Sequence, residues 1–221
     1  MNAPDCQLYL ISPQDVSGDF SRQLTAVLEA GAQLVSAFQF RVKGIDQHEA
    51  ARLAQPLQAI CADHDLAFVV NDDVALAKRL KADGVHLGQS DGPDGQLDIA
   101  DARERLGREV QIGVTCHDSR HLAMEAGEGG ADYVAFGAFY PSATKDTQHR
   151  PQPEILEWWS GLFELPCVAI GGITPANCAP LVAAGADFLA VSSAVWNAAD
   201  PAEAVRQFAS AIAKARTTRK E

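Results

Sequence analysis

The sequence contains no long apolar segment and no leader-like start. No stretch approaches the roughly 20 consecutive apolar residues that a membrane-spanning helix needs. Residues 1–10 show no basic segment followed by an apolar block and a cleavage site, the pattern of a secretory signal. We therefore expect a soluble, cytoplasmic protein with no membrane partner.

Paired cysteines are also missing. The five cysteines are odd in number, widely spaced and never arranged as Cys-x-x-Cys: Cys6, Cys61, Cys116, Cys167 and Cys178. This distribution argues against a disulfide framework and against a zinc ribbon. We expect reduced thiols, most of them packed in the interior.

Positive charge is scarce. The chain has 18 Lys and Arg residues against 29 Asp and Glu residues, and its net charge at pH 7 is −11. Binding to a phosphate backbone needs a broad basic surface, so nucleic acid is not an expected partner. Small anionic substrates remain compatible with this charge if a few cations, backbone amides and a metal are focused in one cleft.

Short apolar runs alternate along the chain with longer mixed segments of helical period. The pattern predicts strands at 8–11, 34–38, 67–70, 84–87, 110–113, 133–136, 167–170 and 188–191. It predicts helices at 18–29, 46–63, 74–81, 97–106, 119–127, 153–159, 175–184 and 201–216. Eight alternating pairs favour a (β/α)8 TIM barrel over an open doubly wound sheet. We expect a single domain over 1–221, with a carboxy-terminal helix and tail at 201–221.

An internal echo supports the barrel. The words EAGAQLV from Glu29, LKADGVHL from Leu80, EGGADYVAF from Glu128 and AAGADFLAV from Ala183 recur about every 50 residues. Each places a small residue at a helix end, just before an even-numbered strand. The repeat unit is then two βα modules; the alternative is that Gly-Ala-Asp is a common helix-to-strand turn.

In a barrel the loops after the strands share one rim, and that rim holds the active site. After the predicted second strand, alternation points Gln39, Arg41 and Lys43 to one side. Two cations and an amide suit a pyrophosphate, which offers several acceptor oxygens. The alternative is a solvated strand edge.

Acidic residues follow the third and fourth predicted strands. Asp72 and Asp91 lie 19 residues apart in sequence, but they follow neighbouring strands, so they can reach a common point. Two carboxylates with phosphate oxygens and waters are a usual set for Mg²⁺. We expect Asp73, at a helix start, to act as a cap.

Thr115 and His117 stand near the end of the fifth predicted strand and bring a hydroxyl and an imidazole to the rim. His117 and His121 have a spacing that suits zinc, but no third ligand is evident nearby, which disfavours a zinc site. Cys116 beside His117 is disfavoured as a nucleophile because adjacent residues project in different directions.

The last three loops have the composition of a phosphate site. The loop at 137–146 carries hydroxyls and a lysine, as in loops that close over a phosphorylated ligand. In the next loop, Gly171 and Gly172 allow close backbone approach, Thr174 suits a helix cap and Pro175 suits the first helical turn. The loops after strands seven and eight form the frequent phosphate site of barrels.

Taken in order, these segments resemble thiamine phosphate synthase over nearly the whole chain. The matching words are LYLI, FQFRVK, VVNDDVALA, DGVHLGQSD, IGVTCH, GADYVAFGAFYPSATKD, VAIGGITPAN and GADFLAVSSAV. The resemblance implies that the pyrimidine pyrophosphate is bound by Gln39, Phe40, Arg41, Val42, Lys43, Asn71, Thr115 and Lys145. It implies Mg²⁺ at Asp72 and Asp91, and thiazole phosphate binding by Ser142, Ala143, Thr144, Gly172, Val191 and Ser192.

The family reaction that the resemblance implies is a dissociative transfer. Pyrophosphate leaves before the thiazole nitrogen attacks the pyrimidine methylene cation, and the product is thiamine phosphate. Mg²⁺, Arg41, Lys43 and Lys145 would stabilise the leaving group. No general base is needed, because the attacking nitrogen carries no proton.

The chain departs from the family pattern at several positions. Arg41-Val42-Lys43 stands where Arg-Glu-Lys is usual, and the family's Asp after the first strand is replaced in LISPQ, at Pro13. Ala138 replaces a common Pro, whereas Thr115 for Ser and Ser142 for Thr keep a hydroxyl. The two lost acids are the departures that bear on activity.

Three alternatives remain open. A thiazole tautomerase on the same barrel would use a histidine at the position of His117, but Asp72 and Asp91 favour the synthase. A non-catalytic binding paralogue would bind the phosphates without turnover, and an unrelated phosphate-binding barrel enzyme would not be expected to carry the acidic pair. The sequence leaves open homo-oligomer formation and the choice between carboxylated and reduced thiazole.

Overall fold

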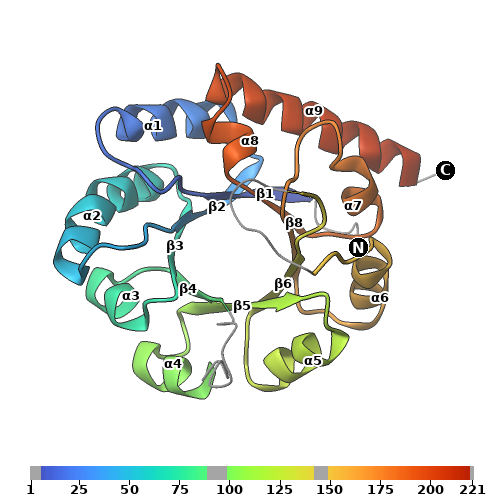
Figure 1. Cartoon of the computed structure of the whole chain (residues 1–221), viewed down its shortest axis with the longest axis horizontal. Helices are drawn as coiled ribbons and strands as arrows, with labels where there is room; N and C mark the ends of the chain where they lie inside the picture. The colour runs from blue at the N-terminus through green and yellow to red at the C-terminus, as the bar shows by residue number, and fades with distance from the viewer. Residues whose placement is uncertain (1–5, 89–98, 142–148, 220–221) are drawn as a thin grey trace.

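Eight parallel strands close into a barrel in chain order, and helices surround it (Figure 1). The computed structural model describes residues 6–88, 99–141 and 149–219. The strands are β1 (Gln7–Ile11), β2 (Val35–Phe40), β3 (Ala67–Asn71), β4 (Gly84–Leu87), β5 (Gln111–His117), β6 (Tyr133–Gly137), β7 (Cys167–Ile170) and β8 (Phe188–Val191). The chain is a single-domain (β/α)8 TIM barrel, as the alternation of elements predicts.

The helices follow the strands with one addition near the end of the chain. They are α1 (Phe20–Ala30), α2 (Gln47–Asp63), α3 (Val74–Leu80), α4 (Ile99–Leu106), α5 (Arg120–Glu128), α6 (Glu154–Leu162), α7 (Ala179–Ala183), α8 (Ser193–Trp196) and α9 (Pro201–Arg219). The sequence did not predict the short α8. Helix α9 packs against α1 and α7, along one side of the ring in Figure 1.

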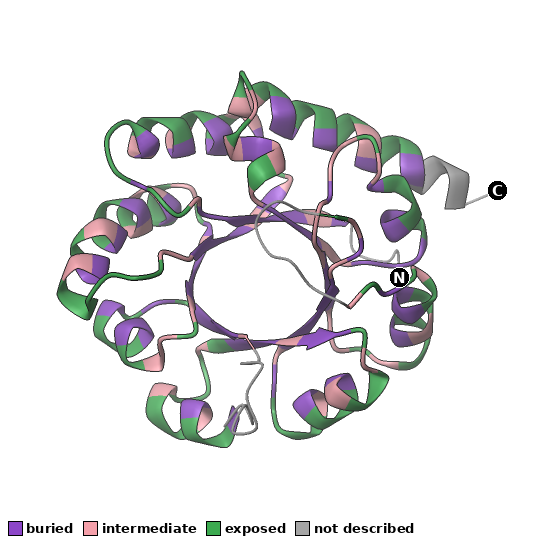
Figure 2. Ribbon diagram, in the orientation of Figure 1, coloured by how far each residue is buried: buried purple, intermediate pink, exposed green. Residues whose placement is uncertain are grey.

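The core has two layers, because successive side chains of a strand point to opposite sides of the sheet. In β2, Phe38 and Phe40 pack outward against the helices, while Ala37 belongs to the cluster inside the barrel. In Figure 2 the strands are mostly buried, whereas the helices are buried mainly on their inward side. Alternation therefore decides which strand residues can reach the interior of the barrel.

The internal echo has a structural basis in three aspartates. The carboxylates of Asp83, Asp132 and Asp187 accept hydrogen bonds of 2.8, 2.7 and 2.8 Å from the amides of Phe68, Ile112 and Cys167. Each aspartate precedes an even-numbered strand, and each donor lies at or next to the first residue of the strand before it. The Ala-Asp pair that these three segments share thus links neighbouring strands at their amino-terminal ends.

Two strands, β2 and β5, extend two or more residues beyond their predicted carboxyl-terminal ends. The apolar pattern ended the second strand at Phe38 and the fifth at Gly113, but β2 reaches Phe40 and β5 reaches His117. The added residues include polar ones that ended the apolar runs, namely Gln39 and Thr115. Both are accommodated inside the barrel because they hydrogen-bond to other interior side chains.

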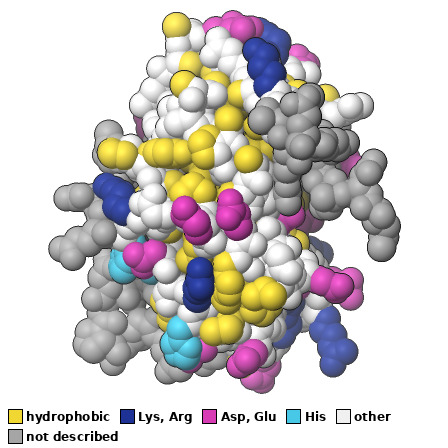
Figure 3. Space-filling model, turned by 90° about the vertical axis from the view of Figure 1, so that its right-hand side faces the viewer, with side chains coloured by type: hydrophobic (Ala, Val, Ile, Leu, Met, Phe, Trp, Pro, Cys, Tyr) yellow, Lys and Arg dark blue, Asp and Glu magenta, His cyan; other side chains and the backbone are white. Residues whose placement is uncertain are grey.

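The outer surface shows mixed charge. On the face in Figure 3, acidic side chains are interspersed with apolar ones and with a few Lys and Arg residues, with no broad basic patch. Within the described residues, no helix has both the length and the apolar character required to cross a bilayer. All five cysteines are buried, and burial raises the pKa of Cys61, Cys116 and Cys167 to about 12.

Candidate active site

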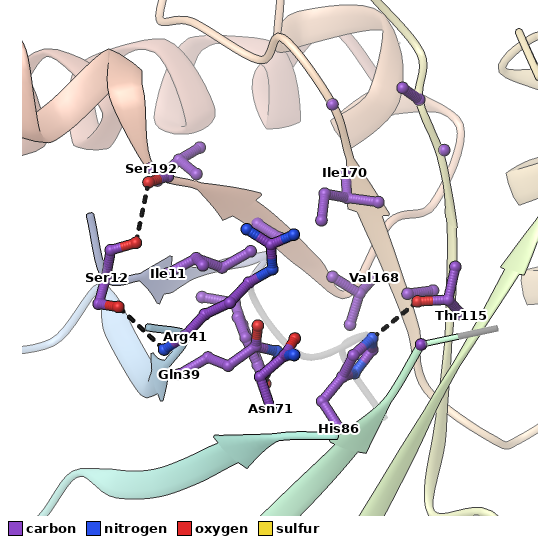
Figure 4. Close-up of a pocket in the computed structure, with 18 of the residues that line it drawn as sticks. Ile11, Ser12, Gln39, Arg41, Asn71, His86, Thr115, Val168, Ile170 and Ser192 are labelled. Carbon is purple, nitrogen blue, oxygen red and sulfur yellow. Dashed lines mark hydrogen bonds between the residues drawn. The ribbon is translucent and has the colours of Figure 1, made fainter. Parts of the chain in front are cut away.

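A cavity of about 660 Å³ occupies the carboxyl-terminal end of the barrel, and every strand or the loop after it contributes to its wall. Figure 4 shows side chains from distant parts of the sequence converging on it, among them Arg41, Asn71, His86 and Ser192. Concave sites of this size suit a small-molecule ligand. The position matches the rim at which barrel enzymes carry their active sites.

The side chains of β2 and its following loop divide as alternation predicts. Gln39, Arg41 and Lys43 line the cavity. Phe40 packs in the outer core, where its ring stacks on Phe68, and Val42 packs against the same layer. The expected substrate contacts of Phe40 and Val42 therefore have no side-chain counterpart in the cavity.

The loop after β1 supports the two cations. The Oγ atom of Ser12 accepts a hydrogen bond of 2.9 Å from the amide of Arg41, and Oε1 of Gln14 accepts one of 3.1 Å from the amide of Lys43. Ser12 is buried and its carbonyl accepts from Oγ of Ser192 at 3.3 Å. Ser12 therefore joins the ends of β1, β2 and β8 (Figure 4).

Asp72 lies at the cavity wall in a left-handed backbone conformation, with φ of 61°. Its Oδ1 accepts a hydrogen bond of 2.7 Å from the amide of Gly88, and its Oδ2 accepts one of 2.6 Å from Nδ2 of Asn71. Ionised carboxylates retain further lone pairs when they accept two such bonds. Asp73 caps α3 by accepting from the amide of Leu76, which confirms its expected role.

Five buried or half-buried side chains form a hydrogen-bonded chain across the interior of the barrel. Nε2 of Gln39 donates to Oη of Tyr9 at 3.1 Å, and that atom lies 2.9 Å from Oη of Tyr133. Oη of Tyr133 lies 3.1 Å from Nδ1 of His86, whose Nε2 lies 2.9 Å from Oγ1 of Thr115. All five side chains line the cavity. Burial lowers the pKa of His86 to about 4 and raises that of Tyr9 to about 12, so both groups are neutral at pH 7.

No role was predicted from the sequence for Tyr9, Tyr133 or His86. The signal for their shared interior position is register: Gly113 of β5 pairs with His86 of β4 and with Tyr133 of β6. A Cβ atom on Gly113 would lie 1.9 Å from the ring of Tyr133. Glycine at 113 therefore leaves the space through which the phenol of Tyr133 reaches His86.

The loop after β7 differs from its predicted form. The sequence pattern placed Thr174 as a cap and Pro175 in the first turn of a helix, but α7 begins at Ala179. Asn177 prevents an earlier start: its Oδ1 accepts from the amide of Thr174 at 2.8 Å and its Nδ2 donates to the carbonyl of Gly172 at 3.0 Å. Thr174 and Pro175 thus do not begin a helix.

Gly171 and Gly172 have positive φ and line the cavity. A Cβ atom on Gly172 would lie 2.4 Å from the carbonyl oxygen of Pro141, so the close approach that this glycine permits is that of the loop after β6. Val191 and Ser192 also line the cavity. The sequence-predicted residues Asp91, Ser142, Ala143, Thr144 and Lys145 lie outside the described residues.

Comparisons with known proteins place this chain in a family. The family model described as thiamine monophosphate synthase matches residues 8–195. The chain is 71% identical to the thiamine-phosphate synthase of Erythrobacter litoralis, over 95% of the chain and 96% of the relative. The chain belongs to the thiamine monophosphate synthase family.

Other members of the thiamine monophosphate synthase family agree in sequence and in structure. The thiamine-phosphate synthase of Rhodospirillum centenum is 49% identical, over 92% of the chain and 96% of the relative. The solved structure of the thiamine phosphate pyrophosphorylase of Pyrococcus furiosus superimposes with a TM-score of 0.79 at 30% identity, covering 95% of this chain and 96% of that one. The activity is that of a transferase, as the sequence resemblance predicts, and the tautomerase and binding-only alternatives are not favoured.

His117 and Cys116 do not form the alternative sites considered above. His117 is buried and lines the cavity, whereas the side chain of His121 is 75% exposed and lies 3.3 Å from Glu125. The ring of His117 stacks on that of His149, with centroids 4.6 Å apart. Cys116 packs in the outer core, and its raised pKa keeps it as a thiol.

Proposed function

We propose that the chain joins 4-amino-2-methyl-5-pyrimidinylmethyl diphosphate to a thiazole phosphate, giving thiamine phosphate and pyrophosphate by a dissociative substitution. One observation carries this proposal: Arg41, Lys43 and Asp72 line a single cavity together with the loops after β7 and β8. Two cations and a carboxylate suit a diphosphate with its metal. The loops on the opposite side of the cavity suit a monophosphate.

Arg41 and Lys43 are the cations that we assign to the leaving diphosphate. Their backbone amides donate hydrogen bonds to Ser12 and Gln14, and these bonds fix the backbone positions from which both side chains extend. Charge that develops on the leaving oxygens is stabilised best by groups that are already oriented. Lys145 is proposed as a third cation.

The residues present fit Mg²⁺ bound together with substrate. Mg²⁺ in phosphoryl sites typically takes one or two protein carboxylates, and phosphate oxygens and waters complete its shell. Asp72 is oriented for this by Gly88 and Asn71. Within 6–88, 99–141 and 149–219 no group of three or more His, Cys, Asp or Glu is arranged to hold a metal ion. Asp72 and Asp91 would hold the ion, and when bound it would supply positive charge to the leaving group.

The thiazole phosphate is assigned to the other side of the cavity. Gly172, Val191 and Ser192 line this side, and the proposed set includes Ser142, Ala143 and Thr144. Because Oγ of Ser192 donates to the carbonyl of Ser12, we assign the phosphate contact of Ser192 to its backbone amide.

The reaction balances without a protein base. The bond between the pyrimidine methylene carbon and the diphosphate oxygen breaks, and its electron pair leaves with pyrophosphate. The thiazole nitrogen then donates its lone pair to the methylene carbon, and no proton is transferred. Gln39, Asn71 and Thr115 are assigned to the pyrimidine, where they orient the ring for this attack.

The partners of the chain are therefore small molecules, and we retain a cytoplasmic location as part of the proposal. The deciding assay mixes purified protein with both substrates and Mg²⁺ and follows thiamine phosphate by fluorescence after oxidation to thiochrome. We expect product that is abolished by EDTA. Asp72→Ala and Lys145→Ala should each lower kcat/KM at least about 100-fold, equivalent to about 2.7 kcal/mol of transition-state stabilisation.

Matched controls are Asp63→Ala and Lys78→Ala, which remove the same charges from exposed helix positions. Both should retain activity. Absence of product from the wild-type protein would refute the proposal. Phosphate binding without turnover would support the non-catalytic reading instead.

A further inference from the structure

The hydrogen-bonded chain from Gln39 to Thr115 crosses the barrel through five different strands. Its order in space is β2, β1, β6, β4 and β5, and the residues at its two ends, Gln39 and Thr115, are assigned to the pyrimidine. The middle members, Tyr9, Tyr133 and His86, contribute neither charge nor a nucleophile to the proposed reaction. Their arrangement therefore calls for another explanation.

The number of hydrogens on each member fixes the direction of donation along the hydrogen-bonded chain. Nε2 of Gln39 donates to Tyr9, whose single hydroxyl hydrogen is then available for Oη of Tyr133. In the same way, the hydroxyl of Tyr133 donates its hydrogen bond to Nδ1 of His86. A neutral imidazole carries one hydrogen, so it stands on Nε2, which donates to Oγ1 of Thr115.

We propose that this hydrogen-bonded chain of side chains determines which groups donate and which accept hydrogen bonds in the pyrimidine site. In it, His86 is held as its Nε2-protonated tautomer. Thr115 then accepts from His86 and keeps its own hydrogen to donate to the ligand, while Gln39 keeps its carbonyl oxygen as an acceptor. Tyr9, Tyr133 and His86 are positioning residues that act through these two ends. The identity of the ligand rests on the proposed function, since an aminopyrimidine offers both a donor amino group and acceptor ring nitrogens.

Because its members are buried, all the hydrogen bonds of the hydrogen-bonded chain must run in the same direction. Tyr9, Gln39, His86 and Tyr133 are each less than 10% exposed, which leaves little room for water to replace a member. Reversing one hydrogen bond inside such a chain leaves two donors or two acceptors facing each other, and an unsatisfied buried group costs about 1–3 kcal/mol. All donor and acceptor roles in the hydrogen-bonded chain therefore reverse together. In the reversed form, His86 carries its hydrogen on Nδ1.

The tautomer of His86 is therefore the direct readout. Two-bond ¹H–¹⁵N correlation spectra distinguish protonated from unprotonated imidazole nitrogens, and the His86→Asn spectrum identifies the signals. We expect Nε2–H in the wild-type protein. An Nδ1–H tautomer in the wild-type protein overturns the proposal.

A variant at Gln39 tests whether a change at one end of the hydrogen-bonded chain alters the tautomer of His86. An ionised carboxylate only accepts hydrogen bonds, so Gln39→Glu should reverse every donor in turn and move the hydrogen of His86 to Nδ1. The ionisation of the new side chain is checked by its ¹³C carboxyl signal. In Gln39→Glu with Tyr133→Phe, the link is broken and His86 should return to Nε2–H.

Two matched controls test whether a new charge or a lost hydroxyl outside the hydrogen-bonded chain also changes the tautomer of His86. Gln14→Glu places the same charge at the cavity wall outside the chain, and Tyr140→Phe removes the hydroxyl of the only tyrosine outside it. Both should leave the wild-type tautomer in place. A tautomer that is unchanged in Gln39→Glu with an ionised carboxylate, or that also reverses in Gln14→Glu, overturns the proposal.

The ligand end is tested by kinetics. Thr115→Val should raise KM for the pyrimidine diphosphate about tenfold, the effect of losing one hydrogen bond, with a smaller change in kcat. Thr115→Ser should retain the wild-type KM. An unchanged KM in Thr115→Val overturns the donor role of Thr115. If the wild-type protein forms no thiamine phosphate, the proposed function fails, while the spectra still decide the direction of the chain.

Discussion

The hydroxyl oxygen of buried Ser12 accepts a hydrogen bond of 2.9 Å from the backbone amide of Arg41, 29 residues further along the chain. The same serine accepts, through its carbonyl, from Oγ of Ser192. One residue thus joins the side of the cavity that carries the cations to the side assigned to the thiazole phosphate. It also stands next to Pro13, where the family acid is replaced, so the departure has not removed support for the cationic loop.

Ser12→Ala should therefore weaken diphosphate binding. The amide of Arg41 loses its acceptor, and the loop that carries Arg41 and Lys43 is less well ordered. We expect KM for the pyrimidine diphosphate to rise about tenfold, the effect of one lost hydrogen bond, in steady-state kinetics. The control is Ser36→Ala, which removes a serine hydroxyl that bonds to the carbonyl of Leu8 near the other end of β2. Equal KM values for both variants would contradict the assigned role of Ser12.

Folding stability should depend on pH through His86. Its pKa is about 4 in the folded state, lowered by burial and by Arg41 and partly raised by Asp72, against 6.5 as its ordinary value. The unfolded chain therefore binds more protons between these values, and stability falls as the pH is lowered through this window. The His86 contribution should be a loss of about 2 kcal/mol between pH 7 and pH 5.

Urea unfolding at several pH values, without added Mg²⁺, measures this dependence. His86→Asn has no imidazole to titrate, so its free energy of unfolding should fall by about 2 kcal/mol less than that of the wild-type protein over the same interval. Parallel profiles for the two proteins would show that His86 is not buried as a neutral group.

Gly113 and Gly161 should respond in opposite directions to the same substitution. A Cβ on Gly113 would overlap the ring of Tyr133, so Gly113→Ala should lower the free energy of unfolding by about 1–3 kcal/mol. Gly161 lies in α6, and a Cβ added there would meet no heavy atom within 4 Å, so Gly161→Ala should raise the free energy of unfolding by about 0.5–1 kcal/mol. Denaturant titrations measure both, and a neutral effect at 113 would mean that Tyr133 has room to move away.

The five cysteines should be unreactive in the folded protein. All are buried, and the pKa of Cys61, Cys116 and Cys167 is raised to about 12, so these groups remain thiols at pH 8. Titration with a disulfide reagent should release no rapid equivalent before denaturant is added and five afterwards. A fast equivalent in the native protein would reveal an accessible thiolate.

The sequence predicted the barrel well where strands are apolar and bounded by turn residues. The ranges 84–87, 167–170 and 188–191 match β4, β7 and β8. The prediction was wrong at the ends of β2 and β5, because Gln39 and Thr115 are polar but find partners inside the barrel. It was also wrong for the start of α7, where the two side-chain bonds of Asn177 hold a turn.

The candidate site was predictable in part for the same reason. Alternation alone separates Gln39 and Arg41 from Phe40, because it depends only on neighbouring residues. The contact between Tyr9 and Tyr133 joins residues 124 positions apart, and it depends on closure of the ring and on the space left at Gly113. Local sequence patterns carry no information on such a pairing.

The position of a metal and a diphosphate in the cavity tests the central claim most directly. Crystals grown with Mn²⁺ in place of Mg²⁺ and with pyrophosphate would locate the ion by its anomalous signal. The account predicts the ion bound to a carboxylate oxygen of Asp72, with diphosphate oxygens between it and the side chains of Arg41 and Lys43. An ion or diphosphate bound away from Asp72, or at the amino-terminal end of the strands, would contradict it.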